Sequence, residues 1–313
     1  MSGVAVGVVF GLAAAVAIGV EQILMAYAAR RWGTVKATFA SVVIAFFLLI
    51  VFAIVTGASI PFRNNDLLPL LGGLGIAAAV AYLAQLESLR AGPLSVVTPI
   101  GATAGAMTVF YAFVLLGERP NAWQWVGIPL ATLGAIFVSI DIQATHRFRI
   151  MSRGPFFAFL AVATGAISNA VLRIPVREIG SMAAILFQRT FTVAFIGVVL
   201  VVMARKGRLP TAVAVTSAGV AASAGTPEPT LSSREKGGWL ALLLAIGVLD
   251  AAAFIFFVEG LQRADAWLIG ILSQSGRVIS VMGGFMLFHE RLRRYQWIGV
   301  ALVVAGLVLA VAG

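Results

Sequence analysis

The sequence predicts an all-α polytopic membrane protein whose ten transmembrane helices form two inverted five-helix repeats. Three observations predict this fold: a composition poor in charge, a series of long apolar runs, and an internal duplication. Of the 313 residues, 61% are hydrophobic and 11% are charged, and the mean hydropathy is +1.03. Soluble domains carry roughly 25% charged residues. Because this chain has too few polar side chains to cover a water-exposed globule, we expect it to lie in a lipid bilayer.

The apolar runs are long enough to cross a membrane, which takes about 20 residues of helix. They occupy residues 4–27, 35–56, 67–89, 93–116, 122–140, 154–173, 182–204, 237–258, 265–288 and 294–312. The sixth run is the weakest, because Asn169, Arg173 and Pro175 interrupt its end. Backbone polar groups in lipid must bond within their own segment, so every run is predicted to be a helix.

A motif that occurs twice, 172 residues apart, identifies the two repeats. The first copy is Leu115, Leu116, Gly117, Glu118, Arg119, Gln124, Trp125, Gly127, Leu130 and Gly134. The second copy is Leu287, Phe288, His289, Glu290, Arg291, Gln296, Trp297, Gly299, Leu302 and Gly306. No gap is needed between the copies, so the chain is an internal duplication. Each half then holds five spans, and an odd number inverts the second half relative to the first.

The repeats are predicted to cover residues 1–145 and 146–313. Helix 6 aligns with helix 1 at an offset of 147, which places Arg177 on Arg30, whereas later helices align at an offset of 172. About 25 extra residues must therefore lie between them. The segment 205–238, rich in Ala, Ser, Thr and Pro, supplies that length, and we expect it to be a flexible surface loop.

Basic residues predict the orientation in the membrane. Gaps on the side of the N-terminus hold five Lys and Arg residues, and the opposite gaps hold fifteen. The positive-inside rule then places both termini outside the cytoplasm and the 205–238 loop inside it. The net charge of +10 comes mainly from these gaps, so it predicts topology and no nucleic-acid partner. The chain has no cysteine, which excludes disulfides, thiolate metal sites and thiol catalysis.

Small residues along the predicted helices indicate close packing. Gly3, Gly7 and Gly11 repeat every four residues, as do Gly101 and Gly105. This spacing lets helix backbones approach each other in lipid, and we favour packing over ligand contact for these glycines.

Four charged residues lie well inside predicted spans: Glu21, Arg189, Asp250 and Arg277. Burying a charge at that depth costs at least about 2.5–3.5 kcal/mol, so such residues are expected to face the interior of the bundle.

Arg277 is the leading candidate for substrate binding, because it lies at the centre of the ninth span. Ser273 and Ser280 share its helix face, and Gln274 lies beside that face. The repeat-related position is Gly105, which would leave room for a bound solute. The alternative is a structural ion pair with Asp250, and the sequence does not separate the two interpretations.

Glu21 is the candidate for proton coupling, with Asp250 as a second acid, and its alternative is an ion pair with Arg189. Gln22, Asn169, Gln188 and Arg189 complete the set of predicted substrate-binding residues. Arg189 lies nearer a helix end than the ninth-span arginine, which favours a pore entrance or a structural pair. For Asn169, a hydrogen bond to a neighbouring helix is the main alternative.

Charged residues at helix ends are predicted to form local ion pairs. Glu259 and Arg263 are four residues apart, and Glu87 lies three before Arg90. Glu118 of the repeated motif is expected to cap the helix that follows it. Arg173, near the end of the sixth span, is expected to extend toward the membrane interface.

The doubled pattern apolar-Gly-Glu-Arg, Gln-Trp-x-Gly and Leu-x-x-x-Gly resembles the drug/metabolite transporter superfamily, in particular proteins with two EamA domains. The stretch Leu89-Arg90-Ala91-Gly92-Pro93-Leu94 resembles that family too. The likeness covers essentially the whole chain and is most specific at 83–136 and 255–308. It implies a ten-helix secondary transporter with a central cavity between its halves, exporting amino acids, other metabolites or toxic compounds. Some relatives carry nucleotide sugars or sugar phosphates.

Two features depart from the family pattern. Arg277 stands in a stretch that is usually apolar in this family, so an unusual or anionic substrate is implied. The basic residues favour external termini, whereas many relatives are thought to keep them cytoplasmic.

Glu21 is similar in place to the proton-coupling glutamate of the small multidrug resistance branch.

These observations predict a secondary transporter, an exporter, of a small polar or anionic organic metabolite. It would work by alternating access, with coupling to protons, in the cell (plasma or inner) membrane. One alternative is efflux of cationic drugs or toxic compounds through Glu21 and the aromatic rings of Trp267, Phe254 and Phe256. Another is a membrane scaffold that does not transport. An enzyme, a cofactor and a metal site are not expected, because both histidines lie at helix ends and no group of catalytic residues converges. The partners are a small-molecule substrate and the bilayer, and the chain is expected to be a monomer or homodimer.

Overall fold

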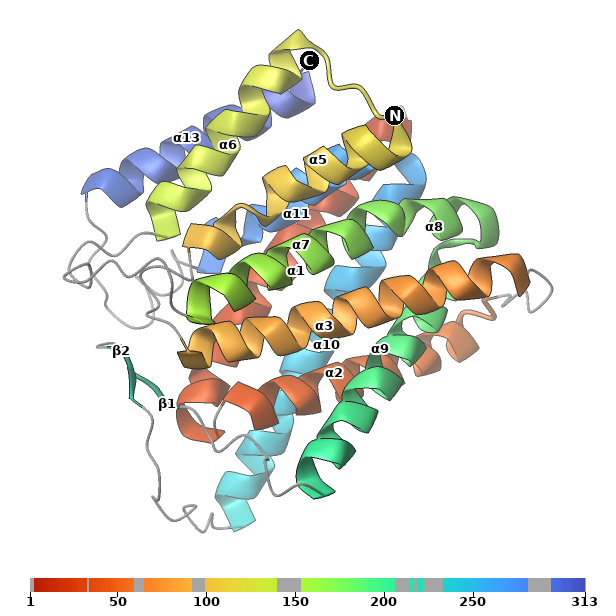
Figure 1. The fold of residues 1–313 in the computed structure, drawn as a ribbon, viewed down its shortest axis with the longest axis vertical. Coiled ribbons are helices and arrows are strands. Elements are labelled where there is room, and N and C mark those ends of the chain that lie inside the picture. The colour runs from red at the N-terminus through yellow and green to blue at the C-terminus, as the bar shows by residue number, and fades with distance from the viewer. Residues whose placement is uncertain are drawn as a thin grey trace.

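The computed structural model describes residues 3–32, 34–58, 65–91, 99–139, 153–205, 214–216, 219–221, 233–280 and 294–312. Its helices lie side by side in one elongated bundle (Figure 1). In the first half they are α1 (Gly3–Trp32), α2 (Thr34–Val55), η1 (Asn65–Leu67), α3 (Leu68–Ala91), α5 (Ala104–Leu116) and α6 (Ala122–Ser139). In the second half they are α7 (Arg153–Val171), α8 (Arg173–Ile179), α9 (Ser181–Arg205), α10 (Ser233–Arg263), α11 (Ala266–Gln274) and α13 (Arg294–Ala312).

The length and composition of the helices fit a membrane. Within the described ranges, six helical segments are long and apolar enough to cross one, and three shorter apolar helices match the predicted second, fourth and fifth spans. The predicted ninth span is described as far as Ser280. Large apolar side chains such as Phe47, Val55, Trp123 and Phe156 are exposed on the outside of the bundle. A lipid-facing surface needs this arrangement, because hydrocarbon solvates apolar groups and not polar ones.

Helix contacts repeat with the two halves exchanged. Helix α1 packs against α10, and its counterpart α7 packs against α3. In the same way the contact of α10 with α2 matches that of α3 with α9, and α1 with α11 matches α7 with α5. Helices α5 and α11 pack on each other, as do α6 and α13. The predicted pair of inverted repeats is therefore confirmed, and α1 begins at the end of the bundle where α13 finishes (Figure 1).

Four glycines of the duplicated motif form the seam between α6 and α13. A Cβ on Gly134 would lie 2.6 Å from the carbonyl oxygen of Gly299, and a Cβ on Gly299 would lie 2.8 Å from that of Gly134. Gly127 and Gly306 face each other in the same way. No side chain fits between these backbones, so the packing of two antiparallel helices explains why each copy of the motif carries both glycines.

The glutamine of each motif copy also bonds across this seam. Gln124 Nε2 donates to the carbonyl oxygen of Ala310 at 3.5 Å, and Gln296 Nε2 donates to that of Val138 at 3.2 Å. Donors and acceptors correspond under the same 172-residue offset. The two halves therefore meet through reciprocal contacts.

The predicted ninth span is interrupted by a turn at Ser275, where α11 ends and a second helical stretch, 276–280, begins. The predicted fourth span has a turn at the repeat-related residue, Thr103, just before α5. The interruption is thus common to both repeats.

Three local predictions need correction. The sixth span is broken after Val171 and resumes as α8, which includes Pro175. The 205–238 segment is not a loop throughout, because it contains an antiparallel pair of strands, β1 (Ala214–Thr216) and β2 (Gly219–Ala221), and the start of α10. Its other residues after Arg205 lie outside the described ranges. Gly7 packs against Ala264 as expected, whereas Gly3 has no atom of another segment near its Cβ position.

Candidate functional site

A cavity of about 250 Å³ lies between helices of both repeats. Its polar lining residues are Tyr82, Gln85, Ser168, Asn169, Gln188, Arg189, Gln274 and Arg277, and the rest of its wall is mainly Ala, Gly and Val. They come from α3, α7, α9, the end of α11 and the stretch after it. Five of the predicted substrate-binding residues thus meet in one place: Asn169, Gln188, Arg189, Gln274 and Arg277.

Arg277 presents its guanidinium group to this cavity and is partly exposed there. A Cβ on Gly101 would lie 3.1 Å from its Nη1 atom, so the guanidinium rests against backbone of the predicted fourth span that carries no side chain at this point. Gly105, the repeat-related residue, faces Gln274 instead. Within the described residues, the Arg277 guanidinium has no acidic partner. The alternative in which Asp250 pairs with Arg277 is wrong, because that carboxylate bonds to another arginine.

Arg189 is that partner and is almost completely buried, at 2% exposure. Its Nη2 donates to Asp250 Oδ1 at 3.3 Å, and its Nη1 donates to the hydroxyl oxygen of Tyr82 at 3.2 Å. Its Cζ atom lies 3.6 Å from the ring centroid of Phe254. A buried cation held by a carboxylate, a hydroxyl and an aromatic face is a structural pair. Of the two interpretations of Arg189, the structure therefore supports the structural pair and not the pore entrance.

Glu21 on α1 lies within electrostatic range of both members of that pair, Arg189 and Asp250. It is partly exposed, whereas Asp250 is buried. The arginine hydrogen-bonds to Asp250, so Glu21 is the outer acid of a three-residue group. A proton bound or released by Glu21 would change the charge beside a buried ion pair.

Three predicted residues lie away from the cavity lining. Ser273 is buried and its hydroxyl donates to the carbonyl oxygen of Gly270 at 3.0 Å. The Ser280 hydroxyl donates to the carbonyl oxygen of Arg277 at 2.8 Å. Gln22 is partly exposed on α1. Both serine hydroxyls are satisfied by their own helix.

Gln188 and Ser168 form a buried polar chain at the cavity wall. Gln188 Nε2 donates to Ser168 Oγ at 3.0 Å, and Ser168 Oγ donates to the carbonyl oxygen of Leu74 at 2.9 Å. The Gln188 Oε1 atom is buried and has no hydrogen-bond partner among the described residues. It is therefore a free acceptor at the edge of the cavity.

Ser168, Tyr82 and Gln85 line the cavity and were not predicted to do so. Ser168 is the residue that aligns with Glu21 in the other repeat, and this alignment was the only feature of the sequence that pointed to Ser168. Tyr82 carries a hydroxyl within an apolar helix, which requires a partner when buried. No feature of the sequence singled out Gln85.

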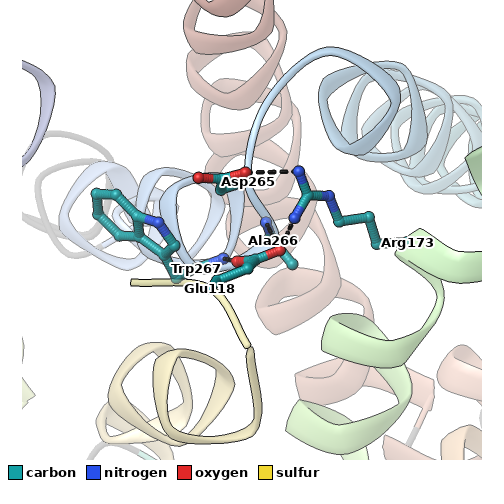
Figure 2. Close-up of polar contacts among 5 residues, drawn as sticks. All are labelled: Glu118, Arg173, Asp265, Ala266 and Trp267. Carbon is teal, nitrogen blue, oxygen red and sulfur yellow. Dashed lines mark hydrogen bonds and ion pairs between the residues drawn. The ribbon is translucent and has the colours of Figure 1, made fainter. Parts of the chain in front are cut away.

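Glu118 caps a helix, as expected, but not the one that follows it. Its two carboxylate oxygens accept the backbone N–H groups of Ala266 and Trp267 at 3.0 and 3.1 Å, at the start of α11 in the other repeat (Figure 2). Arg173 also bonds to Glu118, and its extension to the membrane interface stays a prediction. The predicted pair of Glu259 with Arg263 is confirmed.

The described part of the chain offers no group of three or more His, Asp or Glu residues that could hold a metal ion. The cavity instead combines a guanidinium, amide groups and a hydroxyl. Such groups can donate hydrogen bonds to a polar solute or accept them from it.

A model of the EamA-like transporter family matches residues 5–140 and 152–312, which are the two repeats. The chain belongs to the EamA-like transporter family. As a member it is an integral membrane transporter. An uncharacterised transporter from Sinorhizobium sp, encoded in the cobO 3' region, is 22% identical over 111 residues, which are 34% of this chain and 79% of that protein.

The crystal structure of another protein is similar to this chain over nearly its whole length. It covers 97% of this chain and 96% of its own, with a TM-score of 0.75 and 16% sequence identity. At this identity the likeness shows the fold alone. Within the EamA-like fold, the cavity lies where α7 and α9 of one repeat meet α3 of the other.

Proposed function

We propose that this EamA-like protein is a secondary transporter, an exporter, of a small anionic organic metabolite in the cell (plasma or inner) membrane. The observation that carries the proposal is Arg277, a cation that faces the cavity without an acidic partner among the described residues. A charged side chain without a partner is costly to place this deep in a membrane protein, so such residues usually have a function. An anionic substrate would supply the missing counter-charge during transport. Export is the direction implied by the family resemblance.

The size and lining of the cavity support a small substrate. Drug-sized ligands occupy pockets of roughly 300–1,000 Å³, and this cavity measures about 250 Å³. Its described wall carries two arginines and no acidic residue. Gln274 and Asn169 add hydrogen-bonding groups beside the arginine. Both repeats contribute to the wall within one chain, so a monomer suffices for binding.

The alternative, efflux of a cationic drug, is disfavoured by the same wall. A cation would meet the Arg277 guanidinium, and the ring of Phe254 is already covered by Arg189. Trp267 is buried at 3% exposure and does not line the cavity. A scaffold without transport would have no use for a cavity charge that no described carboxylate neutralises.

We expect alternating access, in which one repeat rocks against the other around the cavity. Glu21 would couple this motion to protons, because its charge acts on the Arg189–Asp250 pair. In proteoliposomes, Glu21→Gln should abolish accumulation driven by a pH gradient while leaving substrate exchange intact. Equal accumulation by the variant and the wild type would exclude Glu21 as the coupling acid.

The central test is transport by Arg277→Ala. A hydrogen bond to a charged group contributes about 1.5–3 kcal/mol, so removing Arg277 should weaken anion uptake by about 10- to 100-fold. Uptake of radiolabelled lactate, malate and the cation tetraphenylphosphonium into proteoliposomes would measure the effect. Arg277→Lys should keep part of the activity. Arg153→Ala, at an exposed residue that begins α7, is the matched control.

Thermal stabilisation of the purified protein by the same compounds gives a second readout. We expect a carboxylate to raise the melting temperature of the wild type and not that of Arg277→Ala. Stabilisation by tetraphenylphosphonium alone, or full anion transport by Arg277→Ala, would overturn the proposal.

A further inference from the structure

A charged cluster joins the two repeats at the end of the bundle where the chain begins and ends. It consists of Glu118, which follows α5 in the first repeat, and of Arg173 and Asp265 in the second. Arg173 bonds to Glu118 through Nη1 and to Asp265 through Nη2, the latter at 2.5 Å. Figure 2 shows the arginine reaching both carboxylates while Glu118 also faces the start of α11.

Glu118 caps the N-terminus of α11 in place of the residue at the N-cap position of that helix. Asp265 occupies the N-cap position but forms no side-chain hydrogen bond to the helix. The free N–H groups at the start of a helix need acceptors and attract negative charge. Glu118 meets both needs from the opposite repeat, through the N–H groups of Ala266 and Trp267.

The cluster lies directly beyond the cavity. Asn169 lines the cavity, and Arg173 follows one helical turn later. On the other side, α11 leads from Asp265 to Gln274 at the cavity wall. Its nine residues span about 13 Å at 1.5 Å per residue. The cluster therefore lies between the cavity and the end of the bundle where the termini lie.

Exposure changes steeply across the cluster. The Asp265 side chain is 50% exposed, that of Arg173 is 11% exposed and that of Glu118 is 5% exposed. Its outer carboxylate thus meets solvent while its inner carboxylate is shielded. A partly buried ion pair gains little net stability, because removing charges from water offsets their attraction. Such a contact can hold one arrangement of the repeats and still be broken during a cycle.

The helix that the cluster holds ends at an interruption of regular helical structure. α11 ends at the turn of Ser275, whose N–H is shared between the carbonyl oxygens of Ile271 and Leu272 at 3.2 and 3.1 Å. Arg277 comes two residues later. On the other side of the contact, Glu118 follows Gly117, whose φ of 67° lies in the left-handed region that favours glycine. The cluster is therefore bounded by two interruptions of helical structure.

We propose that Glu118, Arg173 and Asp265 form an inter-repeat latch that holds the terminus-side end of the cavity closed and opens in each transport cycle. This inference rests on the proposed alternating access. Glu118 is a positioning residue, since it fixes the start of the helix whose far end leads to Arg277. Opening the latch would separate the loop after α5 from α8 and α11 and admit water to the cavity from that end.

Access to a thiol reagent tests the latch without requiring a substrate. The chain has no cysteine, so Asn169→Cys gives a single reporter inside the cavity. A membrane-impermeant maleimide would be added from the side that carries the termini, with the orientation of the vesicles set by a protease-cleavable tag. We expect slow labelling with the latch intact. In Glu118→Ala we expect labelling at least about tenfold faster, because Arg173 and the first N–H groups of α11 both lose the carboxylate that accepts their hydrogen bonds.

Two further variants separate a latch from a fixed structural tether. Asp265→Asn removes only the negative charge of the solvent-exposed partner, so it should fold and speed labelling by about two- to fivefold. Glu259→Gln breaks the ion pair with Arg263 on α10, which lies wholly within one repeat, and should leave the labelling rate unchanged. Folding of each variant would be checked by gel filtration and melting temperature.

Unchanged labelling in folded Glu118→Ala and Asp265→Asn would overturn the latch. An equal increase in Glu259→Gln would do so too, because general loosening would then explain the result. The labelling rate contains no transport step. If Arg277→Ala transports normally while the latch variants label faster, the substrate assignment fails and the latch stands.

Discussion

Arg189 and Arg277 are both arginines deep in apolar helices, yet their surroundings differ completely. Arg189 is buried against Asp250, Tyr82 and Phe254, and its charge is neutralised within the protein. Arg277 faces a cavity and a bare glycine, and no described carboxylate neutralises it. A buried charge is therefore no sign of a binding site by itself. What matters is whether the charge is already paired.

The largest effect on stability is expected from breaking the paired arginine. Asp250→Ala leaves Arg189 buried without its carboxylate, which should lower the free energy of unfolding by about 3–5 kcal/mol. Glu21 also interacts with Arg189, so the loss should lie at the lower end of that range while Glu21 is present. Unfolding in mixed detergent micelles, followed by circular dichroism, would measure it.

The control is Arg277→Ala, which should change the free energy of unfolding much less, because no ion pair is lost. Replacing both members of the first pair, as Arg189→Met with Asp250→Leu, should recover much of the stability. If Arg277→Ala proves as destabilising as Asp250→Ala, then Arg277 has a structural partner and the contrast between the arginines disappears.

A smaller effect is expected from the glycine that faces Arg277. A methyl group at Gly101 would lie 3.1 Å from Arg277 Nη1, so Gly101→Ala should push the guanidinium out of its preferred rotamer. Such a displacement costs about 0.5–1.5 kcal/mol, which corresponds to a two- to tenfold loss of apparent affinity for a transported anion. The concentration dependence of uptake into proteoliposomes would show it as a higher KM with little change in maximal rate.

Gly105→Ala is the matched control on the same helix, one turn away. Its added methyl would lie 3.6 Å from Gln274 Cβ, an ordinary van der Waals contact. If both alanine variants behave alike, general loss of helix flexibility explains the effect and the position of Arg277 against Gly101 does not matter for transport.

Much of the fold could be predicted from the sequence, because it depends on local and repeated signals. Each span is a run of apolar residues, and the motif that includes Gly134 and Gly299 shows the duplication directly. The motif also proved to be the seam of α6 and α13, where helix backbones touch. The sequence missed the break at Leu172 between α7 and α8, although Pro175 had marked the region.

The partners of the charged residues could not be predicted in the same way. Asp250, Arg189 and Glu21 are far apart in the sequence, and which arginine meets which acid depends on how α1, α9 and α10 pack. Glu118 was expected to cap its own next helix because capping signals are read locally. Its true target, α11, lies 148 residues further on and becomes its neighbour only through the inverted fold.

The reciprocal seam of α6 and α13 has a consequence for the ancestry of the chain. Gln124 bonds to Ala310 as Gln296 bonds to Val138, and Gly127 faces Gly306 as its counterpart Gly299 faces Gly134. Contacts of this kind are isologous, the geometry of a homodimer with a two-fold axis. A single five-helix polypeptide could have joined an upside-down copy of itself through this surface before any gene fusion. Fusion would then let the two copies diverge, and the present halves do differ, since Arg277 stands where the first half has Gly105.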